Sequence, residues 1–310
     1  MAVPALGRQE RMGHVTPIRT RSGAGEAERD VPTGAAADAP GVPTTPPAAA
    51  PSRRPGVRPA TVGLPLLGLV IAVTVWWLVT SGLKLVHPAS LPPPQDVWAA
   101  LTAAADVLLP ALGITTLMTL LGFVLSAAAG VLIGMALAAS RRAERMFAPL
   151  LVAINAVPKI ALGPLLVVSV GWGEKPILTM VFLLCFFPIV LSTATGLTTT
   201  PADLAELARS LNASWWQAFR KVRFPAALPQ IFVGLKVAMP LAAIGAVIGE
   251  FYSDKPGLGY QILQYNGIGD TATAWAAIVL IAAMSIVLYA ALSLVERLAL
   301  PWVRATTSAR

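Results

Sequence analysis

Charged side chains are scarce in this chain of 310 residues. Asp, Glu, Lys and Arg make up 12% of it, hydrophobic residues make up 56%, and the mean hydropathy is +0.71. Soluble domains carry about 25% charged residues. The chain therefore lacks the charge that a water-exposed surface needs, and we expect an integral membrane protein.

Cysteine and histidine are almost absent. The single cysteine, Cys185, lies in an apolar run, which excludes a disulfide within one chain and a cysteine-based metal site. His14 and His87 form neither a catalytic dyad nor an HExxH motif. A GxxxxGK[ST] phosphate-binding loop is also missing. We therefore expect no catalytic residues, no metal site and no cofactor, although a Ser/Lys pair remains open as an alternative.

Large apolar side chains are rare in residues 1–60, which are rich in Ala, Pro, Gly, Thr and Arg. This composition cannot bury enough apolar surface to offset chain entropy, so we expect a disordered cytoplasmic tail. An apolar core followed by a small-residue cleavage site is not found, so we do not expect an ordinary signal peptide. The eight arginines suggest a transit peptide, but five acidic residues in the same segment count against it.

Long apolar runs, in contrast, are abundant in the rest of the chain. A helix needs about 20 apolar residues to cross roughly 30 Å of hydrocarbon. Six runs meet this length, and together they predict an all-α transmembrane domain over residues 61–303, with a cytoplasmic tail at 304–310. The expected spans are about 62–82, 111–139, 147–170, 176–198, 230–251 and 273–296.

Positive charge is distributed unevenly between the loops. With the amino terminus inside, the outer side receives three of the 23 Lys and Arg residues, namely Lys84, Lys175 and Lys255. The positive-inside rule therefore predicts a multi-pass protein of the cell membrane with both termini cytoplasmic. The net charge of +8 then reflects topology rather than a nucleic-acid partner. The outer segments are 83–110, 171–175 and 252–272.

The inner segment at 199–229 has the local signals of two short amphipathic helices. Thr200, followed by Pro201, is a good N-cap for the first helix. Asn212 is a natural turn residue, because asparagine tolerates the left-handed conformation. The apolar stripe of the first helix is Leu204, Leu207, Ala208 and Leu211.

The second helix of this hairpin begins at Ser214, and Gln217 three residues later completes a capping box. The dipeptide Phe224-Pro225 is expected to end it. A rigid amphipathic hairpin at a membrane surface suits a soluble partner that docks on it. The alternative is a hairpin in the lipid headgroups, anchored by Trp215 and Trp216.

The hairpin resembles the EAA loop of ABC-importer permeases. The matching residues are Glu206-Leu207-Ala208, then Asn212-Ala213, then Leu228-Pro229. Leu207 replaces the first alanine of the family pattern and Asn212 replaces its glycine; the second change is mild, since asparagine adopts the same backbone conformation. The resemblance extends over about residues 85–303. "VPKIALGPLLVVSVGWGEKPIL", "RFPAALPQIFVGLK" and "GLGYQI" stand in the order typical of the nitrate, sulfonate and taurine importer group.

The resemblance implies a type I ABC-importer permease fold with six transmembrane helices. It implies a subunit that forms the pathway for a small solute: a sulfonate, taurine, nitrate or bicarbonate, or a vitamin or pyrimidine precursor. It also implies partners: two ATP-binding cassette ATPase subunits that hydrolyse the ATP, an extracytoplasmic solute-binding protein, and a second permease chain, most simply an identical one. The ATPase-contacting residues that it implies are Glu206, Ala208, Asn212, Ala213 and Trp215.

Two ionisable residues of the spans, Lys159 and Glu250, are candidates for lining the pathway. A charge at mid-bilayer costs roughly 3 kcal/mol, so such groups usually face a cavity or a partner. For Lys159 the favoured alternative is a lysine that snorkels to the interface, whereas Glu250 equally fits the outer boundary of its span. Snorkelling is the expected role of Lys236. A self-standing secondary transporter, the other membrane alternative, would show two similar halves and several buried acidic residues, which we do not find.

Overall fold

The computed structural model describes residues 60–199, 206 and 210–302. The predicted tail at 1–60 therefore lies outside the described residues except for Ala60, as does the predicted tail at 304–310. The same holds for most of the first hairpin helix, including Thr200 and Ala208. The described residues are helical or irregular, with no strand among them.

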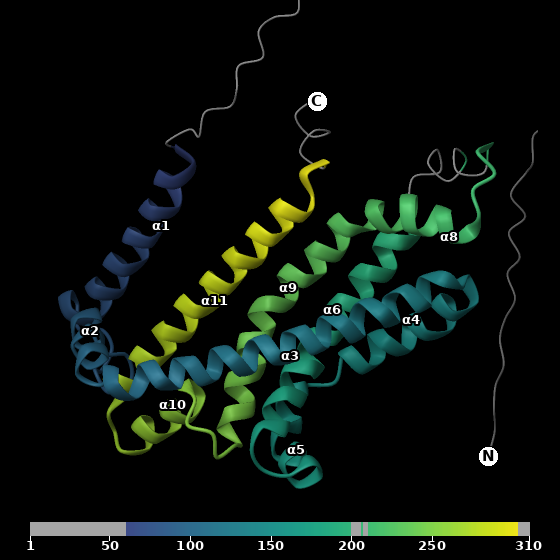
Figure 1. Ribbon diagram of the computed structural model, residues 1–310. Helices are drawn as coiled ribbons and strands as arrows, with labels where there is room; N and C mark the ends of the chain where they lie inside the picture. The colour runs from purple at the N-terminus through teal and green to yellow at the C-terminus, as the bar shows by residue number, and fades with distance from the viewer. Residues whose placement is uncertain (1–59, 200–205, 207–209, 303–310) are drawn as a thin grey trace, which may run out of the picture. The chain divides into compact units, whose positions relative to one another are not determined.

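The described chain forms helices joined by short connections (Figure 1). In chain order these are α1 (Ala60–Trp77), η1 (Leu78–Gly82), α2 (Pro94–Ala103), α3 (Ala105–Ala139), α4 (Arg141–Asn155), η2 (Lys159–Leu162), α5 (Gly163–Val170), α6 (Glu174–Thr198), α8 (Trp215–Ala218), η3 (Phe219–Arg223), α9 (Phe224–Phe251), α10 (Leu258–Gly267) and α11 (Thr271–Ala299).

Four helices in the described part of the chain are long and apolar enough to cross a membrane: α3, α6, α11 and the continuous helix Trp215–Phe251. They include the predicted second, fourth, fifth and sixth spans. The predicted first span corresponds to a shorter apolar helix, Leu67–Gly82. The expected all-α membrane fold is confirmed, and the bent third span described next would be a fifth crossing.

The third predicted span is not one straight helix. Arg145–Asn155 and Lys159–Val170 meet at an angle of 73°. The break lies before Pro158, whose backbone is extended with ψ of 90°. Proline disfavours the helical conformation in the residue that precedes it and removes a backbone donor, so the helix ends there. The third span is thus completely interrupted before Pro158.

The fifth span is longer than predicted, because Phe224-Pro225 does not end the preceding helix. The π-helical turn η3 lies directly before the dipeptide Phe224-Pro225, and the Phe224 amide donates to the Phe219 carbonyl. This wider turn leaves room for the proline ring, which would clash with the carbonyl four residues earlier in a regular helix. The helix therefore runs from the hairpin to Phe251 without a break.

Helix α6 packs between α3 and α9 through small residues. A Cβ at Gly249 would lie 2.5 Å from the Ile177 Cα, and one at Gly245 would lie 2.8 Å from the Val181 Cα. Small residues such as these allow the backbones of two helices to approach closely. Cys185 is fully buried in this core.

The segments predicted to be external lie together. The Trp76 and Trp275 indoles donate to the carbonyls of Pro92 and Ser90, at 3.1 and 3.3 Å. The Ser253 hydroxyl donates to the Gly173 carbonyl at 2.8 Å. In Figure 1, α2 and α10 lie near the same end of α11, and α8 lies toward the opposite end. These segments therefore lie toward one end of α11, and the hairpin lies toward the other end.

Candidate coupling and pathway sites

The turn of the hairpin at 199–229 has the predicted conformation. Asn212 has φ of 50°, in the left-handed region. The Gln217 amide donates to the Ser214 hydroxyl at 3.3 Å, and the Ser214 amide donates to the Gln217 side chain at 3.1 Å. The capping box is therefore complete, and it fixes the start of α8.

Aromatic rings dominate the surface of α8 and the turn that follows it. The Trp215 ring is 5.6 Å from the Phe219 ring and nearly parallel to it, and the Trp216 ring lies at 5.9 Å. Phe219 packs against the buried cluster of Leu197, Ala227 and Ile231. The two tryptophans are 62% and 60% exposed. Phe219 thus anchors the hairpin to the spans, while the tryptophans form an open face.

Three of the four remaining predicted contact residues are described by the structure. Glu206 is helical and exposed, Asn212 is exposed and Ala213 is half-buried. Ala208 lies outside the described residues. The structure therefore brings Asn212, Ala213 and Trp215 into one stretch of the hairpin.

Lys159 lies at the break in the third span. Its ammonium donates to the Asn155 side-chain oxygen at 2.6 Å and lies 5.2 Å from the centre of the Phe187 ring. Non-helical backbone at membrane depth is stable only where protein or a water-filled cavity surrounds it. A held cation beside such a break can bind an anionic group.

Glu250 is fully buried, with 0% of its surface exposed. Its Oε2 accepts a hydrogen bond of 2.7 Å from the Gly259 amide, at the start of α10. Glu250 is the next-to-last residue of α9, so it lies at the end of its span as the boundary alternative expects, but protein surrounds it there. The same burial gives no support to a lining role, because no solute reaches this carboxylate from the surface of the chain.

Two ion pairs were not predicted. Lys236 donates to both carboxylate oxygens of Glu296 at 3.0 and 2.8 Å, so it does not snorkel. The partner lies 60 residues away, which no local pattern shows. Lys255 pairs with Glu174 at 2.9 Å, and the hydrogen bond and attraction of that carboxylate raise the Lys255 pKa. Lys255 thus stays charged at neutral pH and joins two of the outer segments.

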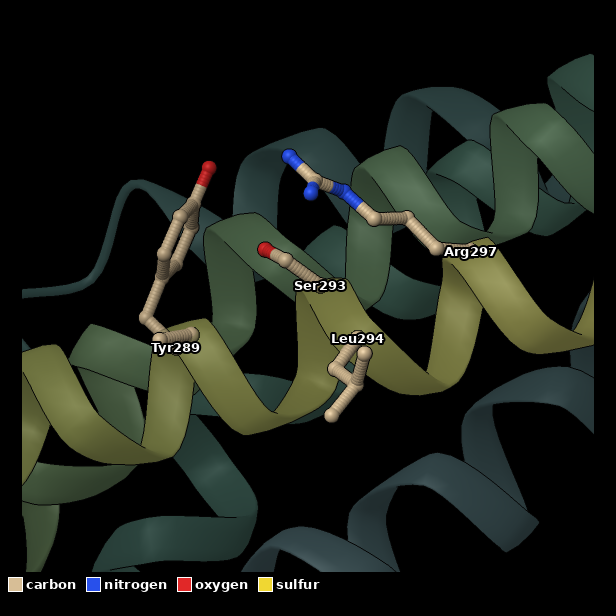
Figure 2. Close-up of a pocket in the computed structure, with 5 residues that line it drawn as sticks. Tyr289, Ser293, Leu294 and Arg297 are labelled. Atoms are coloured by element: carbon tan, nitrogen blue, oxygen red, sulfur yellow. The ribbon is translucent and has the colours of Figure 1, made fainter. Parts of the chain in front are cut away.

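A groove of about 440 Å³ follows one side of α11. Tyr289, Ser293 and Arg297 point to the same side of the helix there, whereas Leu294 points away from them (Figure 2). Tyr289, Ser293 and Arg297 are each four residues apart, and this helical spacing is the sequence signal that could have placed them on one face. Hydroxyls and a guanidinium are groups that bind anions.

A second pocket, of about 540 Å³, lies among the outer segments between the end of η1 and the start of α2. Lys84 and His87 give it a basic character, and Lys84 has a left-handed backbone with φ of 49°. The Gln95 amide donates to the Ser81 hydroxyl at 3.0 Å within it. Among the described residues, no cluster of His, Cys, Asp or Glu could hold a metal ion.

Residues 129–304 match the family of binding-protein-dependent transport system inner membrane components. The chain belongs to this family. The putative aliphatic sulfonates transport permease protein of Bacillus subtilis is 31% identical to it, over 77% of this chain and 87% of the relative. The formylaminopyrimidine transport permease protein of Halalkalibacterium halodurans is 32% identical, over 77% and 95%. The chain is thus the permease component of a binding-protein-dependent ABC importer.

A solved structure agrees with this family at the level of the fold. The crystal structure of an amino acid ABC transporter with histidines superposes with a TM-score of 0.52. The match covers 66% of this permease and 97% of that chain, with 16% of residues identical. At this identity the likeness shows the fold, and the family membership rests on the sequence matches.

Proposed function

We propose that this permease forms the solute pathway of an ATP-driven importer in the cell membrane and couples to a separate ATPase through the hairpin at 200–229. Two copies of the chain, with both termini cytoplasmic, pair around the pathway. One ATP-binding cassette ATPase docks under each copy, and an extracytoplasmic binding protein delivers the solute. The exposed aromatic face of α8 is the observation that carries this proposal.

The hairpin has the two properties that a coupling element needs. Its surface is apolar and accessible at Trp215 and Trp216, and buried aromatic residues are the usual anchors of protein interfaces. Its attachment is stiff, because the capping box fixes the start of α8 and the helix continues into α9. A displacement of the docked ATPase is therefore transmitted to a membrane span.

Co-purification of the cognate ATPase with the permease tests this docking surface. We expect Trp215→Ala to lower the amount of bound ATPase at least tenfold, because the variant removes a central aromatic anchor. Trp172→Ala is the matched control, since Trp172 is 71% exposed in the turn at 171–175. Equal ATPase binding by wild type and Trp215→Ala would show that the ATPase docks elsewhere.

The solute belongs, in our proposal, to the small molecules that the relatives carry. The names of those relatives include aliphatic sulfonates and formylaminopyrimidine. Lys159 favours an anionic solute such as a sulfonate, because its ammonium is held at the broken span. We expect Lys159→Met to lower uptake of an alkanesulfonate at least tenfold with ATPase binding unchanged, and Lys159→Arg to retain uptake. Unchanged uptake by Lys159→Met would remove this residue from the pathway.

A further inference from the structure

The first turn of α10 is capped by side chains from two other helices. The Leu258 amide donates to the Thr115 hydroxyl of α3 at 2.8 Å, and the Gly259 amide donates to the Glu250 carboxylate of α9 at 2.7 Å. The first amides of a helix have no partner within the helix itself. The cap of α10 is thus tertiary, and it joins α10 to two membrane spans.

The backbone before and within this turn lies directly against the Glu250 carboxylate. A Cβ at Gly257 would collide with both carboxylate oxygens, and one at Gly259 would lie 3.0 Å from Oε2. Only glycine permits this approach at the two positions. A buried carboxylate is costly unless donors and a favourable field surround it. The N-terminus of α10 supplies one such donor to Oε2, the Gly259 amide, and its dipole favours negative charge.

Glu250 also lies at one end of the longest continuous helix in the described chain. This helix runs from Trp215 to Phe251 over 37 residues, or about 55 Å at 1.5 Å per residue. Its first residues belong to α8 (Figure 1), and its bounds make Glu250 the next-to-last residue. The hairpin face and the cap of α10 therefore belong to opposite ends of the same helix.

We propose that Glu250 and Thr115 are positioning residues that fasten α10 to α9 and α3, so that α10 moves with the helix that carries the hairpin. This inference rests on the proposed docking of an ATPase at α8. Leu258 also makes apolar contacts within the buried cluster formed with Leu108 and Ala276. Apolar contacts are not directional and allow sliding, whereas the two capped amides fix the position of the α10 N-terminus.

A movement of the ATPase docked at α8 would therefore pass along the helix Trp215–Phe251 and through the capped amides to α10 on the outer side. Leu263 and Gln264 are exposed in the second half of α10, and Ile268 is exposed directly after its last residue. These side chains lie among the segments assigned to the outer side, where the binding protein delivers its solute. Loss of the cap should therefore separate ATP hydrolysis from uptake, without releasing the ATPase.

The test uses the full complex of permease, ATPase and binding protein, with Glu250→Ala, Glu250→Gln and Thr115→Val. Hydrogen exchange of residues 257–262 reports the cap, and alkanesulfonate uptake reports the coupling. We expect Glu250→Ala to speed this exchange and to lower uptake, each at least tenfold, with normal ATPase co-purification. Glu250→Gln keeps an acceptor oxygen and should stay within about threefold of wild type. Thr115→Val should change both readouts in the same direction as Glu250→Ala.

Gln264→Ala, at an exposed position of α10, is the control and should leave both readouts unchanged. The inference is overturned if exchange at 257–262 in Glu250→Ala and Thr115→Val equals that of wild type. It is equally overturned if the exchange rises while uptake stays at the wild-type level. A failure of the ATPase to bind wild-type permease would instead contradict the docking proposal, and the exchange measurement would still report on the cap.

Discussion

Asn212 holds the hairpin turn in a left-handed conformation, with φ of 50°. Glycine reaches this conformation without strain, whereas proline is fixed near φ of −65°. We expect Asn212→Gly to bind the ATPase as wild type does and Asn212→Pro to abolish binding while the permease still accumulates in the membrane. Quantitative co-purification checks both variants. Full ATPase binding by Asn212→Pro would show that the turn is not needed.

The ion pair between Lys236 and Glu296 could not be predicted from either residue alone. The lysine alone fits a side chain that reaches the interface. In the structure it is bound by a carboxylate of α11, and both side chains are about one-fifth exposed. The pair joins the carboxyl-terminal half of α11 to the hairpin-side half of α9. Such a partner, 60 residues away, becomes visible only when the two helices are placed side by side.

At the scale of helices, close packing of α6 against α9 depends on glycine. A methyl group at Gly249 would lie 2.5 Å from the Ile177 Cα, and backbone cannot move aside as a flexible side chain does. We therefore expect Gly249→Ala to lower the free energy of unfolding by about 1–3 kcal/mol. Denaturant unfolding of the detergent-solubilised permease measures this change.

Gly113 is the matched control for that substitution. It lies within α3, and a Cβ there would meet no atom within 4 Å. Gly113→Ala should leave stability unchanged or raise it by up to about 1 kcal/mol, because alanine favours the helix. If both variants unfold at the same denaturant concentration, the contact between α6 and α9 is looser than described.

Local rules predicted the elements whose signals lie within a few residues. The Ser214 capping box and the left-handed Asn212 are of this kind, and both are present. The break before Pro158 and the helix that continues through Pro225 were harder, because the effect of a proline depends on the turn before it. The helices α2 and α10 were missed in the outer segments, where short amphipathic stretches resemble loops.

The candidate sites also differ in whether their residues are contiguous in the sequence or are brought together by the fold. The hairpin could be predicted because its pattern is contiguous in the sequence. The cap of α10 beside Glu250 could not, because the Thr115 hydroxyl and the Leu258 amide that it accepts from are 143 residues apart in the sequence. The position of Lys159 beside Phe187 depends equally on how two helices pack.

At the scale of the whole molecule, we propose that each group of loops lies on one side of the membrane. Single cysteines at Ser90 and Gln264 should react with an impermeant maleimide in intact cells, because both residues are exposed among the outer segments. A cysteine at Gln217 in α8 should react only after the membrane is opened. Replacing Cys185 with alanine removes the natural thiol, which is buried. Labelling of Gln217→Cys in intact cells would reverse the proposed topology.

The most direct test of the account is solute uptake by liposomes that contain the purified permease and its ATPase, with the binding protein outside and ATP inside. The account predicts alkanesulfonate uptake that requires ATP, the ATPase and the binding protein, and that Trp215→Ala lowers at least tenfold. Uptake by the permease alone, driven by an ion gradient without ATP, would contradict it.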